Sequence, residues 1–272
     1  MIVSKNLESL PFELTPDQYA ELVEQFHTCA GDFLKDLPQA TVTATSEQIS
    51  SFLNDPDVRR EPPEVGRPVD ELLSIIRRAA DVDLNGASGR AFAAIPGTGL
   101  VTSAASFFLT QVMNNYTGIS SVGPGSVALE TDVIRWAGRL MGLPDGSAGT
   151  ITSGGSTSIL SAIVVARTKL LGRDFARGVV YCTPQTHFAL HKALQIAGFP
   201  SDAIRYIQID DDLCMCEEDL VKAIQKDQAE GHIPFCIAAN AGTTAATNSR
   251  AHRILRMAEF PLIRNHTPQA QL

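Results

Sequence analysis

Apolar residues recur at helical spacing near the start of the chain. Between residues 15 and 37 they come every three or four positions, which is the period of one helix face. They are Tyr19, Leu22, Val23, Phe26, Phe33 and Leu34. Thr15 and Pro16 are typical of a helix start, so the pattern predicts a helix over 15–37. A polar stretch rich in Thr, Ser and Pro follows over 38–68, and a second helix is predicted from Val69 to about Ala80.

From residue 100 the pattern becomes an alternation of short apolar stretches and longer amphipathic ones. The longer stretches predict helices over 101–114, 126–141, 157–171, 186–197 and 217–230, and the short ones predict strands over 149–152, 178–183, 204–209 and 235–240. Such alternation is typical of a mainly parallel sheet with helices on its faces. We therefore expect an α/β fold whose ligand site lies at the carboxyl ends of the strands.

The composition is that of a folded protein with an acidic balance. Apolar residues make up 44% of the 272 residues, and 22 basic against 30 acidic side chains leave a formal charge of −8. A surface of that sign disfavours nucleic acid and anionic membranes as partners. No apolar run reaches membrane-spanning length, and the N-terminus lacks the apolar core of a signal peptide. These features predict a cytoplasmic protein.

The cysteines and histidines do not form a recognisable metal motif. Five cysteines at irregular spacing indicate reduced thiols, and Cys214 and Cys216 form C-x-C without a second pair at ligand spacing. His187 and His191 are four residues apart, but Phe188 stands where the metalloprotease motif requires Glu. We therefore expect no metal, with His191 as a solvated residue on a helix face.

Three turns rich in small polar residues follow predicted strands. Residues 152–158 read T-S-G-G-S-T-S and open a helix, where free N–H groups would form an anion site. An ordinary N-capped helix after a tight turn would use the same residues, and the motif alone does not separate the two. His187, in the turn 183–187, would project over the sheet edge and either stack on a planar ligand or be solvated. The third turn, 241–244, carries two hydroxyl groups.

Together these stretches resemble the group II pyridoxal-phosphate-dependent decarboxylases, whose members act on aromatic amino acids, glutamate, histidine or diaminobutyrate. The similarity is carried by T-S-G-G-S at 152–156, T-P-Q-T-H at 183–187 and N-A-G-T-T at 240–244, with P-G-T-G at 96–99 and A-L-E-T at 128–131 upstream. It covers about residues 70–244. It implies the fold type I found in transferase-like pyridoxal-phosphate enzymes, present here in incomplete form behind an N-terminal helical arm.

The resemblance also implies pyridoxal 5′-phosphate as cofactor and assigns site residues. The positions that would hold the cofactor phosphate are Ser153, Gly154, Gly155 and Ser156. His187 would stack on the pyridine ring, and Thr244 would lie near the cofactor. Pro96 and Gly97 would border the substrate. The implied reaction is decarboxylation of an amino acid by a homodimer whose arm packs on the partner.

The resemblance stops at Thr244. The family continues with an H-V-D motif and, further on, with the lysine that forms the Schiff base, and neither occurs in this sequence. We therefore expect a C-terminally truncated decarboxylase that is inactive by itself. Residues 1–90 would be the arm, 91–244 the first part of the cofactor domain, and 245–272 an atypical tail. A frameshift or early stop, a split or shortened gene, and a basic binding tail are alternative origins of that tail.

Other interpretations stay open at this point. Another fold type I pyridoxal-phosphate enzyme, such as an aldehyde-forming lyase or an aminotransferase, would share the phosphate turn. A non-catalytic partner or remnant would dimerise through the arm without binding cofactor. An unstable fragment would expose apolar surface, with poor solubility and protease sensitivity as its signs.

Overall fold

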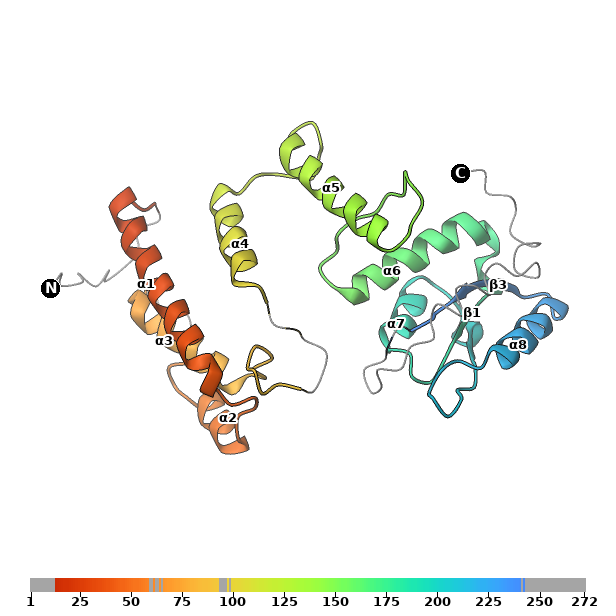
Figure 1. Cartoon of the computed structure of the whole chain (residues 1–272), viewed down its shortest axis with the longest axis horizontal. Coiled ribbons are helices and arrows are strands. Elements are labelled where there is room, and N and C mark those ends of the chain that lie inside the picture. Colours follow the sequence, from red (N-terminus) through yellow and green to blue (C-terminus); the bar gives the residue numbers. More distant parts are fainter. Residues whose placement is uncertain are drawn as a thin grey trace. The chain divides into compact units, whose positions relative to one another are not determined.

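The computed structural model describes residues 13–58, 61, 64, 66–92, 97, 99–240 and 242. The chain divides into two compact units, residues 1–114 and 115–272 (Figure 1). The first unit is helical and the second contains the sheet. No helix within these described ranges is long and apolar enough to cross a membrane.

The first unit consists of α1 (Pro16–Asp36), α2 (Ser46–Leu53), α3 (Val69–Val82) and α4 (Val101–Met113). Both α1 and α2 pack against α3. A capping box begins α1, because the Thr15 hydroxyl accepts a hydrogen bond from the Gln18 N–H and the Gln18 side chain accepts one from the Thr15 N–H. Thr45 and Gln48 form the same box at α2. The predictions of α1, α3 and α4 are confirmed to within two residues at each end.

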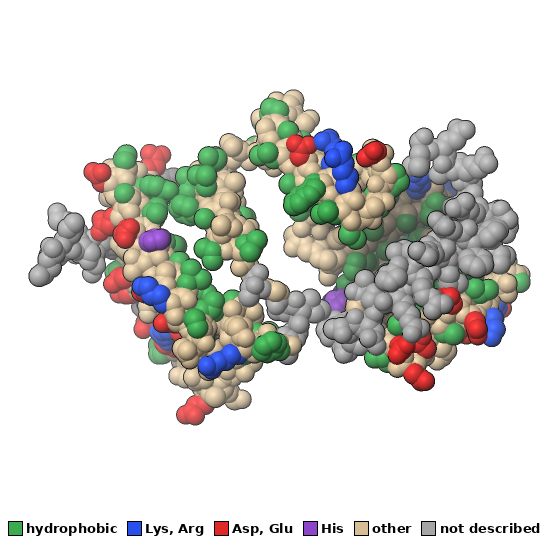
Figure 2. Space-filling view, viewed as in Figure 1, with side chains coloured by type: hydrophobic (Ala, Val, Ile, Leu, Met, Phe, Trp, Pro, Cys, Tyr) green, Lys and Arg blue, Asp and Glu red, His purple; other side chains and the backbone are tan. Residues whose placement is uncertain are grey.

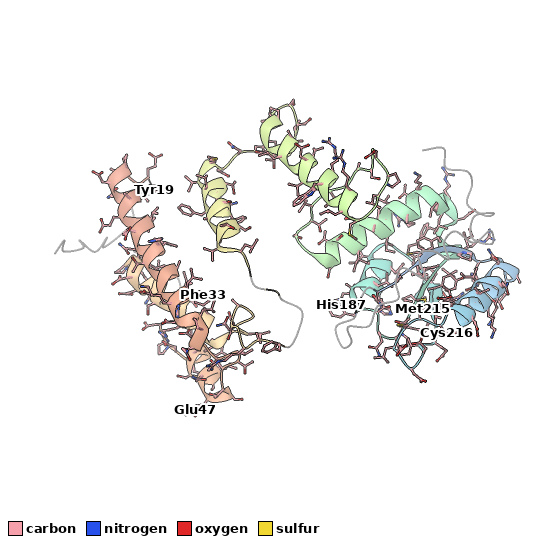
Figure 3. The ribbon with its side chains drawn as sticks, viewed as in Figure 1. Tyr19, Phe33, Glu47, His187, Met215 and Cys216 are labelled. Carbon is pink, nitrogen blue, oxygen red and sulfur yellow. The ribbon has the colours of Figure 1, made fainter. Side chains whose placement is uncertain are left out.

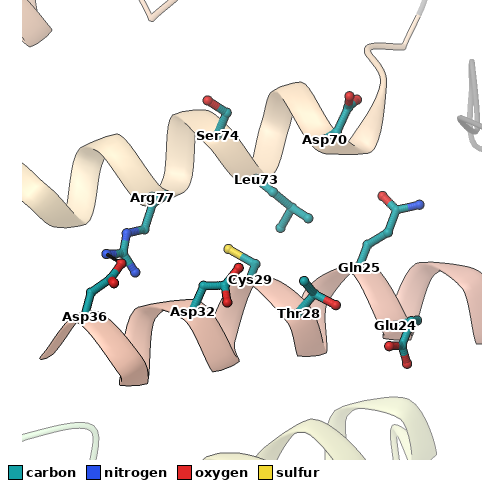
Figure 4. A pocket seen from close by; sticks show the side chains of 10 residues that line it. All are labelled: Glu24, Gln25, Thr28, Cys29, Asp32, Asp36, Asp70, Leu73, Ser74 and Arg77. Atoms are coloured by element: carbon teal, nitrogen blue, oxygen red, sulfur yellow. Dashed lines mark hydrogen bonds and ion pairs between the residues drawn. The ribbon is translucent and has the colours of Figure 1, made fainter. Parts of the chain in front are cut away.

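Arg77 of α3 joins that helix to α1. Its guanidinium lies 2.9 Å from a carboxylate oxygen of Asp36 and 5.0 Å from the ring centroid of Phe33. Beside it, a pocket of about 500 Å³ lies between the two helices, with Cys29 and Leu73 among its lining residues (Figure 4). The remaining lining is largely carboxylate and hydroxyl groups. This pocket therefore belongs to the packing of the helical unit and differs in chemistry from a phosphate site.

The second unit is an α/β structure with a parallel sheet. Its elements are α5 (Pro124–Leu140), α6 (Gly155–Ala166), β1 (Gly178–Cys182), α7 (Ala189–Ile196), β2 (Ile204–Tyr206), α8 (Glu217–Ala229) and β3 (Ile233–Ile237). The strand order is β2-β1-β3, and both neighbours of β1 run parallel to it. The predicted parallel sheet is therefore confirmed, with strands shorter than the apolar stretches that predicted them.

Helices cover both faces of this sheet (Figure 1). Side chains of β1 alternate between the faces, so that one set packs with α6 and α7 and the other with α8. The first core includes Ile163, Val180, Cys182, Leu190 and Leu194, and the second includes Val179, Tyr181, Ile207, Leu220 and Ile224. The connections β1–α7–β2 and β2–α8–β3 thus lie on opposite faces. This reversal beside β1 makes its carboxyl end, next to that of β3, the expected place for a ligand.

Two predictions of local structure were wrong, and one helix was not predicted. Helix α2 lies in the polar stretch 38–68, for which no element was predicted, and the T-x-x-Q capping box at Thr45 was the signal for it. Residues 149–152 form no strand, because a strand needs a hydrogen-bonded neighbour and none of the described strands pairs with them. Helix α7 begins at Ala189 and not at Thr186. The Thr186 hydroxyl accepts a hydrogen bond from the Thr183 N–H at 3.2 Å, which closes a turn ahead of the helix.

Candidate cofactor site

The first predicted site element is the start of α6. Gly154 is the N-cap residue, and no side chain caps this helix end. The first intrahelical bond runs from the Ser158 N–H to the Gly154 carbonyl at 3.0 Å. A Cβ atom added at Gly154 or Gly155 would meet nothing within 4 Å, so the space in front of the helix is open. Uncapped N–H groups facing open space at a helix N-terminus suit a phosphate.

Hydroxyl groups surround the same helix start. Ser153, Ser156 and Thr157 are exposed, and the Ser153 and Thr157 hydroxyl oxygens lie 3.4 Å apart. The Thr152 hydroxyl donates to the Gly154 carbonyl at 3.1 Å, which orients the turn before the helix. The residues predicted to hold a phosphate therefore fit one by backbone geometry and by donor chemistry.

The second element is the turn between β1 and α7, which carries His187. Figure 3 shows the His187 side chain at the edge of the second unit, and it is exposed. Its Nδ1 accepts a hydrogen bond from the Ala189 N–H at 3.2 Å, so the ring nitrogen left to donate is Nε2. His191 instead lies with its Nε2 2.6 Å from the Tyr206 hydroxyl. The two histidines therefore have separate partners, and His191 is not simply solvated.

The third element follows β3, where Asn240, three residues beyond the strand, is the last residue before the predicted turn. Its Nδ2 donates to the Thr186 hydroxyl at 3.0 Å, which links the ends of β3 and β1. Neither Asn240 nor Thr186 was singled out by sequence, although both lie in the motifs that carry the family resemblance. Thr244 and Pro96 lie outside the described residues. Gly97 is exposed and belongs to the first unit, whereas the other described site residues belong to the second.

A buried charge network joins α8 to β1 and β2. Asp227 of α8 accepts a hydrogen bond from the Tyr181 hydroxyl at 2.8 Å, and Arg205 of β2 pairs with it at 2.7 Å. Burial, and then the bond to Asp227, raise the pKa of Tyr181 well above its ordinary value. Glu230 and His232 lie close to Asp227, as metal ligands would. Both Asp227 oxygens are already bonded, however, so the group is part of the packing of α8 on the sheet.

Two thiols line the core beneath the His187 turn. Burial raises the pKa of the Cys182 thiol, and a hydrogen bond with Thr186 partly offsets that rise. Burial, and then the nearby Cys182, raise the pKa of Cys236 to about 11. Both groups are therefore protonated at neutral pH. They act as small apolar side chains and not as nucleophiles.

Taken together, these turns define a class of protein. The second unit is an α/β structure with an open helix N-terminus that suits a phosphate and an exposed imidazole after β1, as in α/β proteins that bind an anionic ligand beside the ends of their strands. Residues 62–251 match the model described as "Pyridoxal-dependent decarboxylase conserved domain". The chain belongs to this family, as its motifs indicated, and pyridoxal 5′-phosphate is the cofactor of the family.

Individual relatives support the same assignment. The chain is 34% identical over 200 residues to the aromatic-L-amino-acid decarboxylase of Bacillus atrophaeus, an alignment that covers 73% of this chain and 42% of the relative. It is 33% identical over 156 residues to a phenylacetaldehyde synthase of Arabidopsis thaliana, which covers 52% of this chain and 32% of the relative. The chain thus spans less than half the length of these curated relatives.

The fold is also that of a solved structure from this family. The structure of Oryza sativa TDC with PLP and tryptamine superimposes with a TM-score of 0.76 at 23% identity. The match covers 86% of this chain and 51% of the rice protein. The expected fold type I architecture, of which the chain contains about half, is thereby confirmed.

Proposed function

We propose that this chain carries the cofactor-binding turns of a pyridoxal-phosphate-dependent decarboxylase that acts on an L-amino acid. The family match over residues 62–251 is the observation that carries the proposal. It coincides with the open, uncapped start of α6 and with the His187 turn. The products would be a primary amine and carbon dioxide, with a proton taking the place of the carboxylate. The cofactor, when bound, supplies an electron sink for the pair left as carbon dioxide departs.

Each site residue has a proposed task. The N–H groups at Gly155 and Ser156 would hold the cofactor phosphate, helped by Ser153 and by the open space at Gly154. His187 would lie flat against the pyridine ring, and Thr244 would contact a polar substituent of the cofactor. Pro96 and Gly97 would border the substrate. The division into an arm (1–90), a cofactor domain (91–244) and a tail (245–272), and the cytoplasmic location, stay predictions of the same kind.

The phosphate site is tested by Gly155→Ala. The new methyl group would occupy the open space in front of α6 without a steric clash. We therefore expect unchanged folding and about a tenfold or greater loss of pyridoxal phosphate affinity, corresponding to one charge-assisted hydrogen bond. Binding of pyridoxal, which has no phosphate, should not change. Gly125→Ala is the matched control, because Gly125 also lies near a helix start with open space. Equal pyridoxal phosphate binding by both variants would contradict the assignment.

Product analysis separates decarboxylation from its main alternative. The similarity to a phenylacetaldehyde synthase favours aldehyde formation as a second candidate. Incubating an intact homologue with pyridoxal phosphate and carboxyl-labelled L-amino acids distinguishes the two. Both reactions release labelled carbon dioxide, but a decarboxylase leaves an amine, whereas an aldehyde synthase consumes dioxygen and leaves an aldehyde and ammonia. Borohydride reduction followed by mass spectrometry tests the expectation that this chain forms no stoichiometric lysine adduct. An adduct together with labelled carbon dioxide would overturn that expectation.

A homodimer is the proposed assembly, and a segment of the chain without charged residues supports it. Residues 91–129 contain no Asp, Glu, Lys, Arg or His, in a chain whose formal charge is −8. Helix α4 lies in this segment, and large apolar side chains along it are exposed, including Phe107 at 66% and Phe108 at 46%. A helix that is apolar on most sides is normally covered. Two copies of an acidic chain meet with least repulsion where neither carries charge. Figure 2 shows further apolar side chains along α5.

Sedimentation velocity tests the dimer. Phe108→Glu places a carboxylate in the proposed interface and should convert dimers to monomers. Leu53→Glu is the control, because Leu53 is equally exposed, at 46%, but lies on α2 outside the uncharged segment. Wild-type protein that stays monomeric at all concentrations, or two variants that dissociate equally, would count against α4 as the interface.

A further inference from the structure

Two hydrogen bonds converge on the hydroxyl oxygen of Thr186. It accepts a bond from the Thr183 N–H at 3.2 Å and one from Asn240 Nδ2 at 3.0 Å. In addition, the Thr186 N–H donates to the Thr183 carbonyl at 2.9 Å. A threonine hydroxyl has one proton and two lone pairs, so both lone pairs of this one are in use.

These bonds join two strand ends that are far apart in sequence. Thr186 follows β1, while Asn240 follows β3, its parallel neighbour. The strand order reverses beside β1, so this link lies where ligands of parallel sheets bind. A hydroxyl that only closed the β1–α7 turn would need only the Thr183 N–H. The bond to Asn240 is the additional feature, and it ties that turn to the neighbouring strand.

His187 is the residue next to this link. The Ala189 N–H donates a hydrogen bond to the His187 ring and so orients the ring from within the turn. One peptide bond joins His187 to Thr186. A turn held only by its own bonds could tilt with respect to β3. The Asn240 amide removes that freedom and also sets the starting point of the segment that leads to Thr244.

We propose that Thr186, held by Asn240, is a positioning residue that fixes the plane of the His187 ring over the cofactor. The inference rests on the proposed function, in which His187 contacts the pyridine ring. Thr186 itself would touch neither cofactor nor substrate. Its effect would pass through the backbone of the turn and through the amide of Asn240.

Four single variants test the link. Thr186→Val replaces the hydroxyl by a methyl group of similar size, and Asn240→Leu removes the amide donor. Thr186→Ser keeps the hydroxyl and serves as the conservative rescue. Gln185→Ala is the matched control, because it alters the same turn without removing a bond that the structure records. Far-UV circular dichroism confirms that each variant is folded before it is compared.

Two measurements on the full chain then test whether the Thr186–Asn240 link orients the His187 ring. Titration with pyridoxal phosphate should show about a 3- to 10-fold weaker affinity for Thr186→Val and Asn240→Leu, the worth of about one hydrogen bond. The circular dichroism that the protein induces in bound cofactor, taken at saturation, should change in the same two variants because it reports ring orientation. Thr186→Ser and Gln185→Ala should resemble wild type. The double variant Thr186→Val/Asn240→Leu should be no weaker than either single variant, since both remove one link.

A third measurement needs no cofactor. In the protein alone, ¹H–¹⁵N spectra of the His187 ring, assigned with His187→Gln, should shift in Thr186→Val and Asn240→Leu but not in Gln185→Ala. Absence of pyridoxal phosphate binding in wild type would refute the proposed function. The ring spectra would still test whether the Thr186–Asn240 link orients His187, because they need no cofactor. Wild-type affinity and ring signals in Thr186→Val, or a Thr186→Ser variant as weak as Thr186→Val, would overturn the positioning role.

Discussion

Asp227 is the acceptor through which α8 holds the sheet, and Asp227→Ala is therefore expected to destabilise the second unit strongly. The Tyr181 hydroxyl, on a side chain with 0% exposure, would lose its acceptor, and an unsatisfied buried hydroxyl costs about 1–3 kcal/mol. Arg205 would lose its partner as well. Breaking a buried ion pair costs about 3–5 kcal/mol. The Arg205 side chain is 26% exposed, however, so it stays partly hydrated and the cost should be smaller. We expect a total of about 3 kcal/mol.

A second substitution, Tyr181→Phe, is expected to change the free energy of unfolding differently in the wild-type and Asp227→Ala backgrounds. In the wild-type background Tyr181→Phe removes a hydrogen bond to a charged acceptor and should cost about 1–2 kcal/mol. In the Asp227→Ala background the same change removes a hydroxyl that has no acceptor. There it should be neutral or stabilising. The double-mutant cycle thus measures the Tyr181–Asp227 coupling apart from general effects of either side chain.

Urea unfolding followed by far-UV circular dichroism gives the free energies, and hydrogen exchange of peptides from β1 and α8 locates the loss. Glu230→Ala, at the C-cap of the same helix, is the control. Its partner Lys226 lies 4.0 Å away and both side chains are mostly exposed, so the change should stay within about 0.5 kcal/mol. The proposed role of Asp227 is refuted if Asp227→Ala lowers the free energy of unfolding no more than this control does, or if Tyr181→Phe lowers it equally in both backgrounds.

Three further changes have defined outcomes. Thr15→Ala removes the side-chain half of the α1 capping box and should cost about 1 kcal/mol, seen as faster hydrogen exchange in the first turn of α1. Gly178→Ala would place a methyl group against Leu171 Cδ1 and 3.1 Å from the Phe175 carbonyl oxygen, so thermal unfolding should reveal about 1–3 kcal/mol of overpacking. Because the folded-state pKa of Cys236, about 11, lies above its ordinary value of 9.0, its stabilising contribution is complete below about pH 9 and is lost as pH rises toward 11. Urea unfolding should show a decline in that interval to which Cys236 contributes at most about 1.4 kcal/mol per pH unit, and Cys236→Ala should remove that contribution.

The sequence by itself determined most of the helices and strands, and the family. Helices α1, α3 and α4 follow from local spacing and end signals, because a helix closes its hydrogen bonds within one segment. The small polar turns at 152–158 and 183–187 were visible for the same reason, since glycine, serine and threonine there act through the local backbone. Short motifs in fixed order then indicated the pyridoxal-dependent decarboxylases, and that assignment was confirmed.

Only the tertiary structure decided which residues meet. The stretch 149–152 has strand-like composition but no strand beside it, and pairing between strands depends on the whole sheet. The bond from Asn240 to Thr186 joins positions 54 residues apart, and the Tyr181–Asp227 contact joins positions 46 apart. No local pattern encodes such contacts, because they arise when parallel strands align and helices cover them. The turn that presents His187 is therefore a local feature, while the link that holds it in place is a property of the folded sheet.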